Sequence, residues 1–370
     1  MKAIGIVCEL NPMHKGHIHL VNQVKTENTA IIGILSGPFV QRGVPAVIDK
    51  WNRAKIAVQN GFDLIVELPE YFVLQSAKYY AEGAVLTLSK FCDLHAIAFS
   101  SEKGFDKHVL SDLVEKSNNI NVNSNVSIRN ALQDEANVNI PSNAILGIEY
   151  IRAVNKFNLN IKTEVFERIG SGYLDSSINS DYPSATALRE IRKSSFEKVK
   201  PFLADGITED IFPFNTPDLN SLNEYIKLAE ILAPLDLTSS PHFETGMDHR
   251  LRNSMDSTKT LEEAFNLSAN KKQSISRYRK MLLTAILGIP SLSDISLETY
   301  IRPLAFNDTG RKLLKNVSAP VIQKITDSSM SEYGLGKLQK EMLNADIKAQ
   351  KLYDYLTGKK FGGFRKIYFA

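Results

Sequence analysis

Short apolar runs separated by amphipathic stretches dominate the first half of the chain. Runs that are short, apolar and closed by polar or turn-forming residues are typical of strands buried on both faces of a sheet. We expect such strands at residues 2–8, 30–37, 63–69 and 94–102, and a further strand at 161–169. We expect helices at residues 16–24, 49–61, 76–91, 142–157 and 181–194.

Strands that alternate with helices predict an α/β fold with a parallel sheet and right-handed crossovers. Ligands of such sheets bind outside the carboxyl ends of the strands. The pattern changes near residue 200, after which helical periodicity prevails. We therefore expect two domains, a parallel-sheet domain over residues 1–200 and a mostly α-helical domain over residues 201–370.

Composition narrows the classes of protein to be considered. The chain has 370 residues, 43% of them hydrophobic, and a net charge of +3, which is too small to indicate a nucleic-acid partner by itself. Its two cysteines, Cys8 and Cys92, lie in apolar runs and form no disulfide or metal-binding pattern. Residues 1–8 are apolar, but no cleavage site follows them, so we expect a buried strand and not a signal peptide. A cytoplasmic protein without a membrane partner is the expectation.

Three of the seven histidines lie within the stretch ELNPMHKGHIHL, residues 9–20. His14 and His17 are three residues apart, so both can reach one spot beside the helix that Gly16 opens. Imidazole donors next to the free N–H groups of a helix N-terminus suit phosphate oxygens, and favour the charge that builds when an α-phosphorus is attacked. The plainer alternatives are a structural or exposed pair, or a zinc pair that lacks further local ligands.

The H-x-G-H spacing after a first strand resembles the signature of the adenylyltransferase (nucleotidyltransferase) superfamily, which includes the class I aminoacyl-tRNA synthetases. The wider pattern resembles one family within it, the bacterial tRNA(Met) cytidine acetate ligases. The resemblance extends from residue 1 to beyond residue 310 and rests on the stretches ELNPMHKGHIHL, SGPFVQRGVPAVIDKWNRAKIAVQNGFDLIVELP, SNAILGIEYIRA, RYRKMLLTAILGI and IRPLAFNDTGRKLL. It implies a Rossmann-like, ATP-binding catalytic domain over residues 1–200 and a basic, tRNA-binding helical domain over 201–370.

The resemblance also implies a reaction in two steps. Acetate attacks the α-phosphate of ATP, supplied with Mg²⁺, and gives acetyl-adenylate and pyrophosphate. The N4 amine of the wobble cytidine (position 34) of elongator tRNA(Met) then takes the acetyl group and becomes N4-acetylcytidine. A cytosine amine is a weak nucleophile, so a mixed anhydride with AMP is a fitting donor. The chain shows no activated serine or cysteine nucleophile and no obvious metal site, and no protein partner is inferred.

By the same resemblance, His14 and His17 are the catalytic pair. The family pattern places on the nucleotide the residues Val7, Asn11, His14, Gly16, His17, Leu20, Ser100, Asn143 and Arg168. Ser100 stands in FSSE, where the family usually has FGSE, and the loop 169–177 also departs from the family. Without a ligand, Asn143 is a helix N-cap and Arg168 an exposed cation at a strand end.

The stretch PSATALRE resembles the second signature of the superfamily. In that reading Ser184 and Thr186 donate hydrogen bonds to phosphates and Arg189 neutralises their charge, but the stretch reads equally well as a plain helix cap. Ser36 lies at the end of the second predicted strand, and Gln41 and Arg42 follow it on a loop. All three are expected to shape the pocket for acetate or cytosine. Arg42 can also be a surface ion-pair partner.

Two basic segments are candidates for binding RNA. Residues 270–282 carry five cations and no acid, namely Lys271, Lys272, Arg277, Arg279 and Lys280. Residues 355–370 add Lys359, Lys360, Arg365 and Lys366 among aromatic side chains. Cations interleaved with aromatics suit phosphate contacts and base stacking, although a charge run is often only a solvated face.

Two other functions remain open from the sequence. The first is a plain adenylyltransferase that transfers AMP to a small acceptor and has no need of the basic domain. The second is a nucleotide- and RNA-binding protein without turnover.

Overall fold

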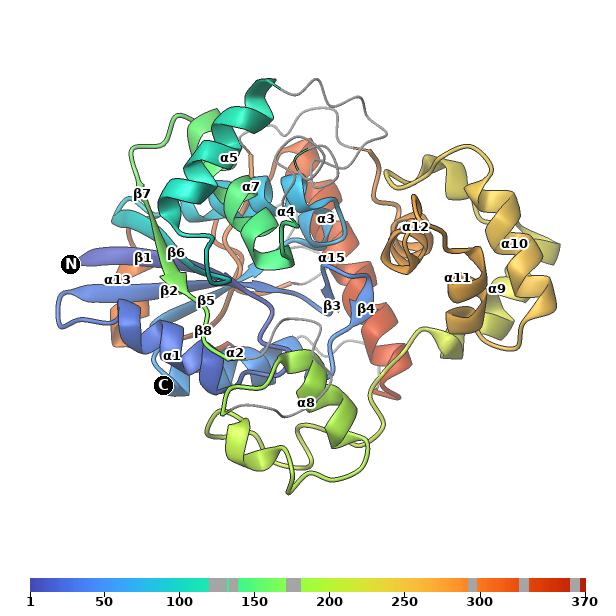
Figure 1. Ribbon diagram of the computed structural model, residues 1–370, viewed down its shortest axis with the longest axis horizontal. Coiled ribbons are helices and arrows are strands. Elements are labelled where there is room, and N and C mark those ends of the chain that lie inside the picture. Colours follow the sequence, from blue (N-terminus) through green and yellow to red (C-terminus); the bar gives the residue numbers. More distant parts are fainter. Residues whose placement is uncertain (120–131, 133–138, 171–180, 292–297, 326–332, 360–366) are drawn as a thin grey trace.

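A seven-stranded sheet organises the computed structural model, which describes residues 1–119, 132, 139–170, 181–291, 298–325, 333–359 and 367–370 (Figure 1). The strands follow the order β7-β6-β1-β2-β5-β8-β9. Their bounds are β1 Lys2–Cys8, β2 Thr29–Ser36, β5 Leu64–Leu68, β6 Leu94–Ser101, β7 Lys162–Glu167, β8 Pro303–Phe306 and β9 Tyr368–Phe369. A separate antiparallel hairpin pairs β3 (Phe39–Val40) with β4 (Val44–Pro45).

The predicted α/β fold class is confirmed. The five predicted strands form the parallel pairs β7–β6, β6–β1, β1–β2 and β2–β5. The β8 strand was not predicted, and it runs antiparallel to β5. It is four residues long and begins with a proline, so its apolar run is too brief to distinguish from a loop.

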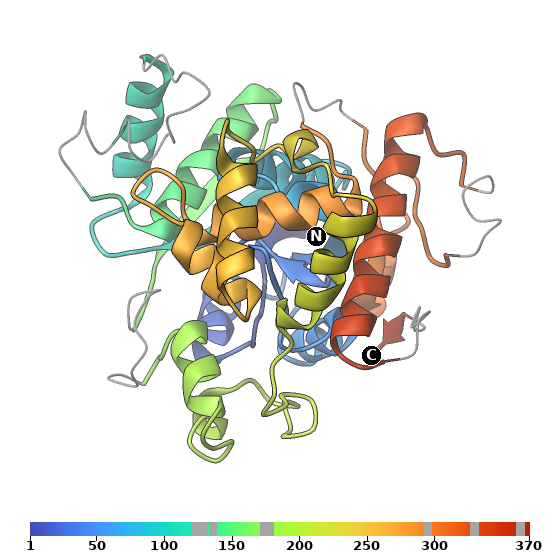
Figure 2. The ribbon, with the colours of Figure 1, turned by 90° about the vertical axis from the view of Figure 1, so that its right-hand side faces the viewer.

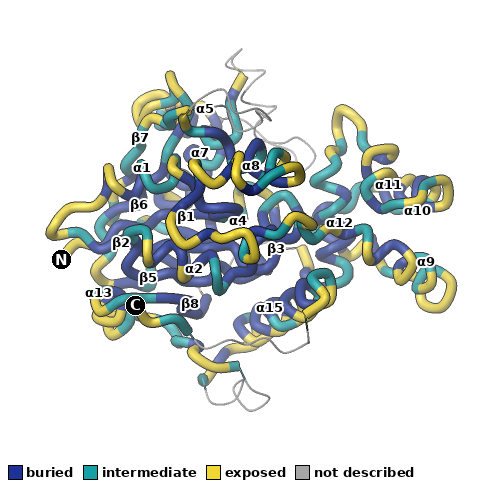
Figure 3. Tube along the Cα trace, turned by 90° about the horizontal axis from the view of Figure 1, so that it is seen from below, coloured by how far each residue is buried: buried dark blue, intermediate teal, exposed yellow. Residues whose placement is uncertain are grey.

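Helices cover both faces of the sheet. Side chains alternate between the two faces along each strand, and the apolar ones on each face are buried by helices. Ile31 and Ile65 pack on one face, with the helices α1 (Lys15–Val24), α2 (Lys50–Gln59) and α8 (Ala185–Arg192). Ile32 and Leu64 pack on the other. The helices there are α3 (Glu70–Val73), α4 (Ala77–Leu88), α5 (Lys107–Asn119) and α7 (Ser142–Lys156). Figure 3 shows the strands buried between these layers.

A second set of helices, the α9–α12 group, lies beside this sandwich (Figures 1 and 2). Its members are α9 (Asn223–Leu232), α10 (Met247–Ser257), α11 (Leu261–Ser268) and α12 (Ile275–Leu287). The remaining helices are α13 (Asp308–Leu313), α15 (Lys337–Leu356) and the 3₁₀ turns η1 (Lys200–Phe202), η2 (Asn220–Leu222) and η3 (Leu237–Ser239). The long α15 helix contacts both α3 and α12, so it joins the group to the sandwich.

The chain returns to the sheet after residue 300, since β8 and β9 are its last two strands. The predicted domain boundary at residue 200 stays a prediction, but strands from both sides of that position belong to the same sheet. Among the described residues, no helix has both the length and the apolar character needed to cross a membrane.

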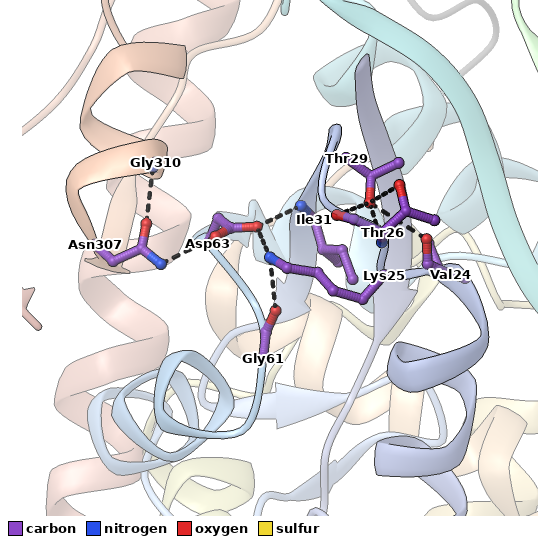
Figure 4. Close-up of polar contacts among 9 residues, drawn as sticks. All are labelled: Val24, Lys25, Thr26, Thr29, Ile31, Gly61, Asp63, Asn307 and Gly310. Atoms are coloured by element: carbon purple, nitrogen blue, oxygen red, sulfur yellow. Dashed lines mark hydrogen bonds and ion pairs between the residues drawn. The ribbon is translucent and has the colours of Figure 1, made fainter. Parts of the chain in front are cut away.

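Asp63 ties this returning segment to the first strands (Figure 4). Its carboxylate accepts hydrogen bonds from the Ile31 backbone N–H at 2.8 Å and from Asn307 Nδ2 at 3.0 Å, and it pairs with Lys25. Asn307 Oδ1 also accepts from the Gly310 N–H at 3.0 Å, which caps α13. One buried carboxylate thus links β2, β5 and α13.

A buried charge cluster lies near the carboxyl ends of β2 and β5. Glu67 is paired with Lys50 at 2.5 Å and with Arg302 at 2.9 Å. Burial opposes ionisation of Glu67, but Arg302 and then Lys50 lower its pKa below the usual value. Nearby, the Tyr300 hydroxyl donates to Asp346 Oδ2 at 2.6 Å. Residues from three distant parts of the sequence therefore meet under the loop that follows β2.

Candidate nucleotide-binding site

A cavity of about 320 Å³ opens at the carboxyl ends of β1 and β6, where a parallel sheet binds its ligands. Most of the predicted nucleotide and substrate residues line it. They are Val7, Asn11, His14, Gly16, His17, Leu20, Gln41, Arg42, Ser100, Asn143, Arg168 and Arg189. Ser36, Ser184 and Thr186 are not among its lining residues.

His14 and His17 form a reciprocal cap at the start of α1. The Gly16 backbone N–H donates to His14 Nδ1 at 3.1 Å, and the His14 backbone N–H donates to His17 Nδ1 at 3.2 Å. The two rings are 3.9 Å apart between centroids. Each Nδ1 is therefore an acceptor, which leaves the proton of the neutral ring on Nε2 as a donor.

Both imidazoles are neutral near pH 7. Burial, and then the Arg168 charge, lower the pKa of His17 to about 3. Burial, and then His17 and the nearby arginines, hold the pKa of His14 well below its usual value. The pair can thus offer two N–H donors to an anion without adding two charges to a buried site.

Gly16 is required by the histidine pair itself. A Cβ at this position would lie 2.9 Å from Cε1 of the His14 ring. Asn11 is placed by its neighbours in a similar way, since its Oδ1 accepts from the Val47 N–H at 2.8 Å and its carbonyl accepts from Arg189 Nη1 at 2.7 Å. The turn after β1 is therefore fixed before any ligand arrives.

Two roles were considered above for the stretch PSATALRE, phosphate binding and helix capping, and each fits a part of it. Ser184 is fully buried and caps α8 by accepting from the Ala187 N–H at 3.0 Å. The Thr186 hydroxyl accepts from Arg189 Nη2 at 3.0 Å. Ser184 and Thr186 thus have capping and supporting contacts, whereas Arg189 reaches the cavity wall.

Asn143 is held by a residue that the sequence analysis did not single out. The N-cap position of α7 is Pro141, so the expectation that Asn143 is the N-cap is wrong. Asn143 Nδ2 instead donates to Glu102 Oε1 at 3.0 Å, and the Ala144 N–H donates to Glu102 Oε2 at 3.2 Å. Glu102 belongs to the quoted FSSE stretch, so a charged residue just after the strand was the available signal.

The remaining walls supply charge and apolar surface. Arg42 and Arg168 add two cations to Arg189 around the cavity. The rings of Phe99 and Tyr150 pack 5.4 Å apart and both line it, a surface that suits a base or a ribose and that the sequence did not identify.

Gln41 belongs to the β3–β4 hairpin, and its N–H donates to Glu9 Oε1 at 2.9 Å. Ser36 is fully buried at the end of β2, outside the cavity lining.

The basic segment 270–282 is less open than its sequence suggests. Arg277 pairs with Glu244 at 2.9 Å, and Arg279 is held by Glu262, with one contact of 3.0 Å from Nε. Glu262 belongs to α11 and Glu244 to the loop before α10, so the absence of acid within the run did not reveal them.

Lys280 is buried and donates to the Gln75 carbonyl at 3.0 Å, and burial lowers its pKa to about 8. We withdraw it from the RNA-binding set. Lys271 and Lys272 are exposed.

The second basic segment lies mostly outside the described residues. Lys360, Arg365 and Lys366 fall there, and nothing further is said of them. Lys359 is described, and its Nζ lies 3.2 Å from Asp49 Oδ2. Within the described ranges, no group of three or more His, Cys, Asp or Glu side chains is arranged to hold a metal ion.

A parallel sheet with an imidazole pair and a cationic cavity at its carboxyl edge defines a nucleotidyltransferase. The family model "HIGH Nucleotidyl Transferase" matches residues 1–363, and the chain belongs to this family. The resemblance found in the sequence is thereby confirmed.

Curated relatives carry a more specific name. The tRNA(Met) cytidine acetate ligases of Clostridium novyi (strain NT) and Clostridium acetobutylicum are each 30% identical to this chain, with 96% of both chains covered. A crystal structure of apo TmcAL from Thermotoga maritima matches with a TM-score of 0.84 and 25% identity over 100% of this chain and 99% of that chain. The same protein bound with alpha-thio ATP matches with a TM-score of 0.82.

Proposed function

We propose that this chain is an ATP-dependent tRNA(Met) cytidine acetate ligase. The observation that carries the proposal is the pair of neutral imidazoles, His14 and His17, with Nε2 donors beside a cavity lined by three arginines. The name shared by relatives over nearly the whole chain supports it, as does the nucleotide analogue bound to the similar Thermotoga maritima protein.

In the first step, an oxygen of acetate attacks the α-phosphorus of ATP. The bond from that phosphorus to the bridging oxygen breaks, and pyrophosphate leaves with the electron pair. The Nε2–H groups of His14 and His17, with Arg168 and Arg189, stabilise the negative charge that builds on the phosphates. Mg²⁺ would be bound mainly by the phosphates of ATP and would neutralise part of their charge.

In the second step, the N4 amine of the wobble cytidine in elongator tRNA(Met) attacks the acetyl carbonyl carbon. The bond from that carbon to the AMP oxygen breaks, AMP leaves with the electron pair, and the amine releases one proton. Gln41 and Arg42 lie on the β3–β4 hairpin and line the cavity, which supports their assignment to the acetate or the incoming cytosine. Ser36 ends β2, the strand that precedes this hairpin.

The nucleotide is held along the first turn and across the sheet edge. Glu102 fixes Asn143 toward the adenosine, while Ser100 narrows the approach where the family pattern has glycine. The tRNA backbone is bound by the helical region after residue 200, with Lys271 and Lys272 among its exposed cations.

One assay tests the whole proposal. The pure protein is incubated with ATP, labelled acetate and unmodified elongator tRNA(Met), and the digested RNA is examined for N4-acetylcytidine. The expected product requires ATP and acetate together and disappears in H14A and H17A. An AMP-bearing small product would identify a plain adenylyltransferase. Binding of ATP and tRNA without release of pyrophosphate would identify a protein that does not turn over.

A further inference from the structure

The β3–β4 hairpin joins the cavity to the α9–α12 group. Its turn residues Gln41 and Arg42 line the cavity, and the Gly43 N–H closes the turn by donating to the Val40 carbonyl at 2.8 Å. Figure 1 shows β3 and β4 between the sheet and α12. The hairpin is therefore the part of the cavity wall that lies nearest to the helices proposed to bind tRNA.

The base of the hairpin is fixed by buried contacts. The Phe39 N–H donates to Glu70 Oε1 at 2.9 Å, and the Tyr353 hydroxyl donates to the Ala46 carbonyl at 2.9 Å. The Arg53 guanidinium bonds the carbonyls of Gly37 and Glu9, which follow β2 and β1. The base of the hairpin is thus anchored to the sandwich. The position of its tip, residues 41–43, depends on the contacts that those residues make.

The tip touches α12 directly. The Ser276 hydroxyl donates to the Arg42 carbonyl at 3.0 Å. Gly43 has a φ of +72°, and a Cβ there would lie 2.9 Å from Cγ and 3.1 Å from the backbone nitrogen of Lys280. Both contacts hold the backbone on the C-terminal side of Arg42, whereas on its other side the Gln41 N–H is held by Glu9.

The same section of α12 is bound to its own group. Arg277 Nε donates to the His242 carbonyl at 2.8 Å and pairs with Glu244, while Arg279 pairs with Glu262. A displacement of the α9–α12 group, for example when RNA binds, is therefore transmitted to Ser276 through these contacts. Among the described residues, the hydrogen bonds and bridge of the histidine pair lead to Gly16, the start of α1 and Leu203, and not to α12.

We propose that Ser276 is a positioning residue that holds Arg42 for transfer of the acetyl group to tRNA and is not needed to form acetyl-adenylate. This inference rests on the proposed function. The contact lies on the side of the cavity toward the α9–α12 group, from which the cytidine would enter, and the histidines act at the strand end. Loss of the contact should therefore separate the two half-reactions.

The test measures each half-reaction alone. Acetate-dependent exchange of pyrophosphate into ATP, without tRNA, reports adenylate formation, and single-turnover acetylation of elongator tRNA(Met) reports transfer. S276A should lower the transfer rate about tenfold, which is the typical effect of one lost hydrogen bond, and leave exchange within about twofold of wild type. S276T keeps the hydroxyl and should restore transfer. G43A, which pushes the tip off α12 by a different route, should give the same selective loss.

S274A is the matched control on the same helix. Ser274 caps α12 by accepting from the Arg277 N–H and forms no hydrogen bond with the hairpin residues that the structure describes, so its loss weakens the helix without releasing Arg42. It should lower thermal stability and leave the ratio of transfer to exchange unchanged. Equal losses of both half-reactions in S276A, or no loss of transfer, would overturn the proposal. A wild-type protein that catalyses neither half-reaction would instead overturn the proposed function.

Discussion

The backbone N–H of His14 donates to Nδ1 of His17, while Nδ1 of His14 accepts from the Gly16 N–H. Both Nδ1 atoms are thus committed to the backbone, and only the two Nε2 atoms are left for a ligand. The cap and the anion-binding donors are different atoms of the same rings, so a substitution can separate the two roles.

His14→Asn tests that separation. The asparagine oxygen can replace Nδ1 as an N-cap acceptor, but the variant has no donor in the place of Nε2–H. We expect the free energy of unfolding to change by less than about 1 kcal/mol and the kcat of acetate-dependent pyrophosphate exchange to fall about 100-fold or more. H14A, which removes both functions, should lose stability as well. Exchange at the wild-type rate in H14N would remove the role given to Nε2.

The lowered pKa values predict a stability that falls on acidification. The histidines of the unfolded chain take up protons near pH 6.5, whereas folded His17 does so only near pH 3. The unfolded state therefore binds more protons below pH 6.5, and the free energy of unfolding decreases by up to about 1.4 kcal/mol per pH unit for each such histidine. Urea unfolding at pH 5, 6 and 7 should show a shallower slope in H17N than in wild type. An equal slope in H17N and in wild type would contradict the buried, neutral His17 ring.

Glu102→Ala should weaken nucleotide binding through Asn143. The variant removes the acceptors of both Asn143 Nδ2 and the Ala144 N–H, so the amide loses its orientation and the first turn of α7 loses its carboxylate. We expect the KM for ATP to rise about tenfold, with a smaller effect on the KM for acetate. Pyrophosphate exchange at varied ATP and varied acetate gives both values. An equal rise of the two would contradict a specific role toward the nucleotide.

Asp63→Ala should be among the most destabilising single changes in the sheet. It leaves the fully buried Ile31 N–H without its side-chain acceptor and deprives Asn307 and Lys25 of their partner. We expect a loss of about 2–4 kcal/mol in the free energy of unfolding, measured in urea. N307A breaks only the link to α13 and should cost less. A loss below about 0.5 kcal/mol in D63A would show that the Asp63 contacts contribute little.

The two kinds of cation in residues 270–282 should behave differently toward tRNA. K271Q/K272Q removes two exposed charges, so the slope of log affinity against log salt should fall by about 1.5. R279Q breaks the contact with Glu262 and should lower thermal stability more than it changes that slope. Filter binding of tRNA(Met) at several salt concentrations distinguishes these outcomes. An unchanged slope in the double variant would place the RNA elsewhere.

The sequence predicted those features that depend on neighbouring residues. Strands such as 2–8 and helices such as 49–61 follow from local patterns, and the structure has these two at Lys2–Cys8 and Lys50–Gln59. The H-x-G-H turn identified the cavity because spacing alone brings the two rings together. The contact between Glu102 and Asn143 was missed because it joins residues 41 positions apart.

Contacts between residues still farther apart in the sequence were harder to predict. The β8 strand exists because it pairs with β5, more than 230 positions earlier, and no local pattern encodes that pairing. Arg277 and Arg279 looked available because Glu244 and Glu262 are absent from their own stretch of sequence. A run of like charges in a sequence therefore predicts a charged, available surface only where the fold brings no opposite charge next to that run.

The return of β8 to the sheet affects any attempt to isolate the catalytic half. A fragment that stops at residue 200 would leave the backbone of β5 as an open edge and would strip Arg302 from the Glu67–Lys50 pair. Such a fragment should self-associate when expressed. The helices between residues 220 and 290 are thus inserted in the sequence between strands of a single sheet. To remove them without disrupting the sheet, the chain before and after them must be joined and not truncated.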